Sequence, residues 1–474
     1  MDDYDHGVEY TPKSVSTNPS LTLGVLRDRG IKYVRIQWVD LSNKTRFRIV
    51  PVSYFEKMFQ GRRPGVGVAS ACLGFVGLVL VPRFEPMGEY LYVPDLSSLR
   101  VCPYAPGHAS VLGWFHRKAP ISTADGELSV EVDLCPRSLL GRVVEEAQTV
   151  SNVNFLVGFE TEFILLTSTN PLQAINHHAW TASEAFPSGK LETIALEEIA
   201  NDIQESDIEL QMYHGEAAPG QYEVVTGPLP PLQAADALVH TREIIRNVAA
   251  RYGLHATFAP RVYATSPGSA AHTNISVHSR NGEVKLREGL STSESSFLAG
   301  VLEHLEALPA LTLPIPASYK RVVDGAWSGG TYACWGTENR EAPIRLVNAT
   351  SPPSRRFEMR FVDATANPHL VLAGILTAGH DGIRKQQELK VRNCPGPKAA
   401  AEMSIEEREG FGITRRLPLT WQEARSNFEK DELFKKDFGD DFVTRYLSVN
   451  QVLGELLEQG DSEDDKLLHL IEYF

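Results

Sequence analysis

Residues 157–166 read VGFETEFILL, an apolar run that is interrupted by two glutamates, Glu160 and Glu162. Side chains of a strand alternate between its two faces, so a strand here places both carboxylates on the same side. The two acids repel each other, and their apolar neighbours leave them poorly hydrated. We therefore expect a group of opposite charge to meet them.

Four other stretches place acids, a histidine or arginines in strand-like sequence. QMYHGEAAPGQYEVV (211–225) contains Glu216 and Glu223, GSAAHTNISV (268–277) puts His272, Asn274 and Ser276 on one face, RRFEMRF (355–361) puts Glu358 and Arg360 on one face, and NREAPIR (339–345) contains Arg340 and Arg345. Any one of them has an ordinary structural explanation, such as a satisfied core histidine or a surface ion pair. Together the five glutamates and the histidine offer hard oxygen ligands with one imidazole, which suits Mg²⁺ or Mn²⁺.

The arginines in these stretches suit a polyphosphate, because a guanidinium group binds phosphate oxygens in a bidentate manner. The sequence contains neither a GxxxxGK[ST] phosphate loop nor a GxGxxG dinucleotide motif after a strand. The pattern therefore predicts phosphoryl transfer supported by metals and arginines, with the nucleotide held in a metal-lined funnel.

Composition excludes several classes of protein. The net charge of −14, without a run of Lys or Arg, argues against nucleic acid and anionic membranes as partners. The longest apolar run, residues 71–82, is shorter than the ~20 residues of a membrane span, and the acidic start MDDYDHGVEY is unlike a signal peptide. The five cysteines are scattered, without a CxxC pair. We expect a soluble cytoplasmic protein with reduced thiols.

The pattern along the chain predicts an α+β protein with three parts. Residues 1–19 are polar and read as a flexible arm. Residues 20–106 read as a small β-rich unit that begins with a short helix at 21–30, and residues 107–474 read as a large domain. In that domain, amphipathic helices are expected to start at Pro136 and near Pro231, and a further helix after the cap Asn367.

The motifs GFETEF, HGEAAPGQYE, GSAAH, SYKR, NREAPIR and RRFEMRFVD followed by ANPHL resemble, in order and spacing, those of the glutamine synthetase superfamily. The resemblance extends from about Leu21 over nearly the whole chain. It implies an N-terminal β-grasp-like domain, followed by a catalytic α/β domain whose antiparallel sheet forms the metal-lined funnel. It also implies ATP, two to three Mg²⁺ or Mn²⁺ ions per site, and a homo-oligomeric ring, often a dodecamer of two stacked hexamers with active sites shared between subunits.

The resemblance also implies roles for individual residues. By this match, the first metal is held by Glu162, Glu216 and Glu223, the second by Glu160, His272 and Glu358, the phosphates by Arg340, Arg345 and Arg356, and the substrate carboxylates by Arg321 and Arg360. Asn274 replaces a histidine of the family near ATP, where it and Ser276 are expected to bind the nucleotide. Two histidines outside these motifs, His177 and His178, read as surface residues.

Two acids that bind ammonium in glutamine synthetases are missing. Residues 65–71 read GVGVASA, without the aspartate, and Trp327 stands in the flap where the family has glutamate. A tryptophan offers an alkyl or aryl amine an apolar surface and a ring face, which ammonium cannot use fully. These departures are similar to the γ-glutamylpolyamine synthetase branch. We therefore expect an ATP-dependent ligase that joins a carboxylic acid, the γ-carboxyl of glutamate, to a primary amine other than ammonia through an acyl phosphate.

Alternatives remain open on the sequence alone. Trp327 can also be a tryptophan that simply packs in its loop. The chain can be a glutamine synthetase with an ammonium site built from other residues, or a catalytically silent relative with a structural or signalling role. Pro267, which replaces an asparagine that the family places near the substrate amino group, leaves glutamate as the acid open as well.

Overall fold

The computed structural model describes residues 5–15, 20–123, 126–279 and 289–474. The strands are β1 (Tyr33–Val39), β2 (Thr45–Pro51), β3 (Val66–Ala69), β4 (Phe75–Val76), β5 (Val79–Leu80), β6 (Glu89–Pro94), β7 (Arg100–Val101), β8 (His108–Val111), β9 (Gly113–Ser122), β10 (Leu128–Glu131), β11 (Val153–Thr169), β12 (Leu172–Ala174), β13 (Leu210–Gly215), β14 (Gln221–Thr226), β15 (His255–Thr257), β16 (Thr273–Ser279), β17 (Trp335–Thr337), β18 (Ile344–Val347) and β19 (Arg356–Met359). The helices are α1 (Val52–Met58), α2 (Pro136–Val150), α3 (Leu191–Glu205), α4 (Pro231–Arg251), α5 (Thr292–Glu303), α6 (Pro309–Thr312), α7 (Ser318–Arg321), α8 (Pro368–Lys385), α9 (Ile405–Gly410), α10 (Trp421–Lys430), α11 (Glu432–Phe438), α12 (Asp440–Leu457) and α13 (Glu463–Tyr473).

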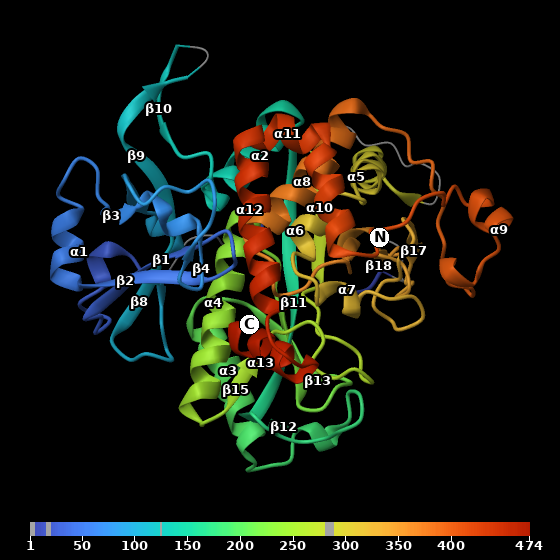
Figure 1. Cartoon of the computed structure of the whole chain (residues 1–474), viewed down its shortest axis with the longest axis horizontal. Coiled ribbons are helices and arrows are strands. Elements are labelled where there is room, and N and C mark those ends of the chain that lie inside the picture. The colour runs from blue at the N-terminus through green and yellow to red at the C-terminus, as the bar shows by residue number, and fades with distance from the viewer. Residues whose placement is uncertain (1–4, 16–19, 124–125, 280–288) are drawn as a thin grey trace.

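The N-terminal region is built from two open four-stranded sheets, which lie to one side of the molecule in Figure 1. Their strand orders are β2-β1-β8-β7 and β10-β9-β6-β3. The predicted β-rich character is therefore confirmed, but the helix expected at 21–30 is wrong. Only Leu23–Val25 forms a short 3-10 helix. Gly24 lies inside this stretch and lowers its helix propensity.

Strand pairing in this region continues past the division expected after residue 106. β8 pairs in parallel with β1, and β9 pairs antiparallel with β6. β10 then pairs with β9, so the two sheets include residues up to Glu131. The β-grasp description and the division at residue 106 stay predictions.

A nine-stranded open sheet forms the centre of the rest of the chain. Its order is β13-β14-β11-β16-β19-β18-β17, with β12 and β15 paired to β11. Neighbours are antiparallel except β17 and β18, which are parallel. The 17-residue strand β11 runs through the middle of the sheet and carries the VGFETEFILL stretch. The expected mixed fold is present, and its sheets are open.

Helices pack around this sheet and confirm the three predicted starts. α2 begins at Pro136, α4 at Pro231, and α8 at Pro368, where the side chain of Asn367 accepts hydrogen bonds from the amides of His369 and Leu370. α8 packs closely on α5 because Gly382 lies on their interface. A Cβ there would lie 2.1 Å from the carbonyl oxygen of Ser296, so a larger residue would separate the helices.

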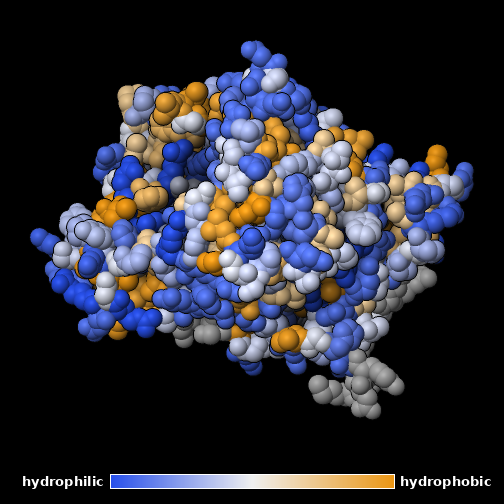
Figure 2. All heavy atoms as spheres, turned by 90° about the horizontal axis from the view of Figure 1, so that it is seen from below, coloured by the Kyte–Doolittle hydropathy of each residue, from blue (hydrophilic) through white to orange (hydrophobic). Residues whose placement is uncertain are grey.

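The surface and the cysteines agree with the composition. Figure 2 shows polar and apolar side chains interspersed over one face of the molecule. Among the described residues, the helices are too short or too polar to cross a membrane. The five cysteines all lie in described segments and are free thiols, and four of them are buried.

The N-terminal segment is ordered in part by contacts with distant residues. The amide of His6 donates to Ser351 Oγ at 2.9 Å, and the hydroxyl of Tyr10 bonds to the carboxylate of Glu209. Residues 1–4 and 16–19 of the expected flexible arm lie outside the described residues. The described part, residues 5–15, contacts residues near β13 and β19 of the nine-stranded sheet.

Candidate metal and nucleotide site

Strand register gathers the acids that the sequence distributes over two hundred positions. Glu162 on β11 lies opposite Glu223 on β14. β16 pairs with the edge of β11 opposite to β14. Next to this pairing, the amide of Glu160 donates to the carbonyl of His272 at 3.0 Å. Glu358 on β19 lies opposite Asn274 on β16. Neighbouring strands thus bring these side chains to one region of the sheet.

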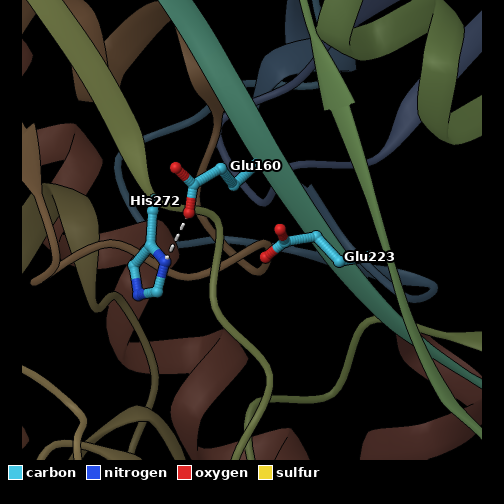
Figure 3. A group of neighbouring side chains, drawn as sticks. All are labelled: Glu160, Glu223 and His272. Atoms are coloured by element: carbon cyan, nitrogen blue, oxygen red, sulfur yellow. Dashed lines mark hydrogen bonds and ion pairs between the residues drawn. The ribbon is translucent and has the colours of Figure 1, made fainter. Parts of the chain in front are cut away.

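Three of these side chains converge in Figure 3, where His272 and Glu160 point toward one another and Glu223 approaches from β14. His272 Nδ1 lies 3.1 Å from Glu160 Oε2 and 3.5 Å from Glu358 Oε1. Ligand atoms of Glu160, Glu223 and His272 all lie within 4.8 Å of one another. A single cation can therefore be reached by all three.

A second group contains a residue that the sequence analysis missed. His214 lies on β13, and Glu216 follows directly after the end of this strand. His214 Nδ1 lies 3.3 Å from Glu216 Oε1, and its Nε2 lies 3.1 Å from Glu223 Oε1. Ligand atoms of these three side chains also lie within 4.8 Å of one another. The HGE spacing in QMYHGE was the available signal, because it places His214 two residues from a glutamate that was predicted to bind a metal.

Three of these acids are almost completely buried. Glu162, Glu223 and Glu358 are 7%, 6% and 1% exposed. Burial, and then repulsion by neighbouring glutamates, raises the pKa of Glu162 and of Glu223 well above the usual value. Burial also raises the pKa of Glu216, against the opposing effects of His214 and Trp180. Burial, reinforced by Arg360, lowers the pKa of His272 well below its usual value.

This arrangement fits divalent cations. Like charges directly opposite each other on a sheet are destabilising, and buried carboxylates are tolerated when paired or metal-bound. Glu162 illustrates the point, since one of its oxygens accepts from two uncharged groups, Gln221 Nε2 at 3.0 Å and the amide of Ala270 at 3.1 Å, and His272 Nδ1 lies 3.9 Å from the other. Carboxylate oxygens with imidazole nitrogens are ligands that Mg²⁺ and Mn²⁺ accept.

Two of the predicted arginines neutralise one acid. Arg345 on β18 donates to Glu358 Oε2 at 3.0 Å, and Arg360 binds the other oxygen of the same carboxylate. Arg345 also pairs with Glu338. Glu358 therefore has compensating charge, in contrast to Glu162 and Glu223.

Arg321 and Arg340 lie at the two extremes of exposure. Arg321 is 2% exposed and donates to the carbonyls of Arg360 and Val362 at 3.1 and 3.2 Å. These contacts position Arg360, and a substrate-binding role for Arg321 stays a prediction. Arg340 is exposed in the loop between β17 and β18.

A cavity of about 630 Å³ adjoins the acids. Three residues predicted to bind the nucleotide, Asn274, Ser276 and Arg356, line it together with Glu160. Arg356 Nε donates to Asn274 Oδ1 at 2.9 Å, and Asn274 Nδ2 donates to Glu160 Oε1 at 2.9 Å. Arg345, the fourth predicted residue, lies instead beside Glu358. The volume falls in the ~300–1,000 Å³ range typical of small-molecule sites.

Trp327 is not packed in its loop as the simple structural alternative supposed. It is 66% exposed, has a φ of 51°, and its carbonyl accepts from Arg360 Nη2 at 2.8 Å. Its ring lies 6.1 Å from that of Trp180, edge to face, and Trp180 is 52% exposed. The side chain of Trp180 is close enough to Glu216 to lower the pKa of that carboxyl, against the larger effect of burial. Sequence reasoning missed Trp180, which follows the His177 and His178 pair and carries no motif.

The flap around Trp327 is held by two carboxylates. Glu341 accepts from the amides of Gly325 at 3.1 Å and of Trp327 at 2.5 Å. Asp324 accepts from the amide of Thr331 at 2.8 Å and pairs with Arg416. Both carboxylates are thus engaged in holding the loop.

Comparison with known proteins agrees with this geometry. The family model described as glutamine synthetase, catalytic domain, matches residues 133–460. The chain is 30% identical to gamma-glutamylpolyamine synthetase GlnA3 of Streptomyces coelicolor, over 93% of each chain. It is 31% identical to protein fluG of Emericella nidulans over 96% of its own length, and it spans half of that protein.

Solved structures show the same fold. A structure described as a GmaS/ADP complex superposes with a TM-score of 0.76 at 25% identity, covering 94% of this chain and 98% of the other. A structure described as a novel glutamine synthase homolog superposes with a TM-score of 0.76 at 27% identity, covering 94% and 99%.

Proposed function

The chain belongs to the glutamine synthetase family, and from this premise we propose that it joins the γ-carboxyl of glutamate to a primary amine other than ammonia, at the expense of ATP. The observation that carries the amine specificity is the exposed pair Trp327 and Trp180, beside the acid cluster. The relative GlnA3, whose name describes a γ-glutamylpolyamine synthetase, supports the same choice. Assembly as a ring of subunits is part of the proposal, since it rests on the family resemblance.

The reaction has two steps. The carboxylate oxygen of the acid attacks the γ-phosphorus of ATP, the bond to the bridging oxygen breaks, and ADP leaves behind an acyl phosphate. The amine nitrogen then attacks the acyl carbon, inorganic phosphate leaves, and the nitrogen loses a proton. The product is an amide, and each turnover releases one ADP and one phosphate.

The acid cluster would hold the divalent cations. One would be bound by Glu160, His272 and Glu358, and the other by Glu162, Glu216 and Glu223, with His214 beside the second set. When bound, these ions would neutralise phosphate charge and polarise the transferring group. The chain's own contribution is to keep six ligands oriented by adjacent strands, in a region that excludes most water.

Arginines and polar groups would orient the phosphates. Arg345, Arg340 and Arg356 are proposed phosphate ligands, with Asn274 and Ser276 lining the nucleotide cavity. Arg360 would stabilise the acyl phosphate, because Glu358 holds its guanidinium and Arg321 holds its backbone carbonyl in place. A bidentate guanidinium group is suited to this task.

The tryptophan pair would select the amine. An alkyl or aryl amine can place its apolar part against an exposed indole ring. A second, cationic nitrogen of a polyamine can lie over a ring face. Ammonia gains nothing from either contact. The pair lies next to Glu216, so an amine held there is near the proposed metal-bound phosphates.

An ADP-release assay tests the proposal. With glutamate and Mg²⁺ fixed, we expect polyamines or monoamines to stimulate release more than ammonia does. Trp327→Ala and Trp180→Ala should each lower kcat/KM for the preferred amine by roughly tenfold or more, since the ring contacts contribute about 1–2 kcal/mol. Activity with ammonia should change little.

Tyr54→Ala is a matched control, because Tyr54 is an aromatic residue of α1 that is 54% exposed. It should leave the preference among amines unchanged. Ammonia as the best acceptor of the wild-type protein would overturn the proposal in favour of a glutamine synthetase. No ADP release together with no ATP binding would instead indicate a silent relative.

A further inference from the structure

The N-terminal segment is tied to the loop that precedes β19. The carbonyl of His6 accepts from Ser351 Oγ at 2.7 Å and from Ser354 Oγ at 2.5 Å. The hydroxyl of Tyr10 bonds to Glu209 and accepts from Gln211 Nε2 at 2.9 Å. Both anchors join residues that are far apart in the sequence, so the segment is held by tertiary contacts.

Gly7 makes this contact close. Its φ of 82° lies in the left-handed region that favours glycine. A Cβ at this position would lie 2.8 Å from Ser354 Oγ and 2.9 Å from Asn348 Nδ2. A larger residue would therefore be strained and would push the segment away from the loop.

The anchored segment forms part of the cavity described above. Residues 7–11 line it, together with Asn274, Ser276 and Arg356. The lining combines these polar groups, which suit phosphates and a ribose, with apolar side chains such as Phe159 and Met212, which suit a base.

A chain of contacts connects the segment to the acid cluster. Ser354, which binds His6, also offers its carbonyl to Arg356 Nη1 at 3.5 Å. Arg356 then binds Asn274, and Asn274 binds Glu160. The anchor and the proposed phosphate ligands therefore share one loop and strand.

We propose that residues 7–11 are a wall of the nucleotide site and contact the nucleoside part of bound ATP, so that nucleotide affinity depends on the N-terminal segment. The inference rests on the proposed ATP-dependent function. It adds a binding element that lies outside residues 133–460, where the catalytic-domain family model matches.

Calorimetric titration of the full chain with ATP and with ADP in Mg²⁺ tests the inference directly, without reference to turnover. Deletion of residues 2–11 should weaken binding of both nucleotides by roughly tenfold, the loss expected for about 1.4 kcal/mol of contacts. Gly7→Val should weaken binding in the same direction. Lys13→Ala is the matched control, because Lys13 is exposed in the same segment and does not line the cavity, and it should bind like wild type.

The outcomes separate this inference from the proposed function. A wild-type protein that does not bind ATP ends both. A wild-type protein that binds ATP, with a deletion variant that binds equally or more tightly, overturns only the role of the segment. Mn²⁺ binding by the variants checks that the acid cluster is intact.

Hydrogen exchange of the wild-type protein gives a second measurement that needs no variant, in case the deletion does not fold. Amides of residues 6–11 should exchange more slowly when ATP is present, because a bound nucleoside covers them. Unchanged exchange at saturating ATP would overturn the inference.

Discussion

Two buried charge clusters in this molecule differ in how their acids are compensated. In the first, around Glu162 and Glu223, the strands bring carboxylates opposite each other. In the second, Arg137 on α2 lies between Asp236 on α4 and Asp95, with Nη2 2.8 Å and 2.7 Å from their carboxylates. His369 Nε2 also lies 2.9 Å from Asp236 Oδ1.

The pKa values of the acids in the two clusters are shifted in opposite directions, although both clusters are buried. Burial raises the pKa of Asp236, but Arg137 and His369 lower it more strongly, so that it lies well below the usual value. Burial and neighbouring glutamates together raise the pKa of Glu162 and Glu223. At similar exposure, the pKa of an acid is therefore lowered where the fold supplies a cation and raised where neighbouring acids surround it. The second cluster is compensated within the fold, whereas the first lacks such compensation, which supports the proposal that it binds cations from solution.

Removing the cation from the structural cluster should give the largest effect. Arg137→Ala leaves the carboxylate of Asp236 buried with only His369 beside it, so the free energy of unfolding should fall by about 3–5 kcal/mol. Denaturant unfolding measures this. Arg142→Ala on the same helix is the control, because its ion pair with Glu131 is exposed and should contribute less than about 1 kcal/mol. Equal losses in the two variants would mean that burial of the pair does not matter.

Removing an acid from the cluster around Glu162 and Glu223 should not lower the free energy of unfolding of the metal-free protein. Glu223→Gln eliminates a repelling charge, so the metal-free protein should be at least as stable as wild type, while Mn²⁺ affinity and ligase activity should fall by about 100-fold. Thermal unfolding in a chelator and Mn²⁺ titration measure the two effects.

Glu192→Gln is a matched control for that variant, since Glu192 is 7% exposed and bonds only an amide, Asn176 Nδ2, at 3.1 Å among the hydrogen bonds of the described residues. It should leave Mn²⁺ binding unchanged. A Glu223→Gln protein that still binds Mn²⁺ with wild-type affinity would show that this cluster is not a metal site.

The smallest expected effect is a pH dependence of stability that comes from His240 on α4. His240, one turn after Asp236 on α4, lies 3.2 Å from Ser110 Oγ and 3.1 Å from Ser206 Oγ. Burial, with a further contribution from Arg100, lowers its pKa from 6.5 to about 3. A depressed pKa means that neutral His240 stabilises the fold above pH 6.5, and that this stability is lost as the pH falls from 6.5 towards 3.

The loss should be up to about 1.4 kcal/mol per pH unit relative to His240→Gln, which lacks the titrating group. Unfolding of both proteins at pH 7 and pH 5 in Mg²⁺ measures the difference. His177→Gln is the control, because His177 is exposed and its substitution should leave the pH dependence unchanged. The same pH dependence in wild type and His240→Gln would show that the buried imidazole does not contribute.

Features that depend on neighbouring residues could be predicted from the sequence. The two-residue spacing of Glu160 and Glu162 predicted that they share a strand face, and β11 contains both. The proline and asparagine starts of α2 and α8 were predicted in the same way. The motif resemblance predicted the family, and the family match confirms it. In each case the signal lies within one element, because capping and side-chain alternation are local.

Features that join distant residues could not be predicted in this way. Trp180 carries no motif of its own, and the contact of His214 with Glu223 depends on the pairing of β13 with β14. The polar N-terminal segment looked flexible, since no local pattern reveals that Ser351 and Ser354 bind it. The pairing of β8 with β1 and of β9 with β6 joins strands that lie far apart in the sequence, and no local pattern indicates it.

The sequence by itself therefore determined which candidate residues to consider, because acids and a histidine in apolar strands need compensating charge wherever they lie. The tertiary structure decided which of them face each other. Strand register sets Glu162 against Glu223, and helix packing sets Arg137 against Asp236. The direction in which the pKa of a buried carboxylate shifts depends on that placement, since electrostatic interactions depend on distance and burial, not on sequence separation.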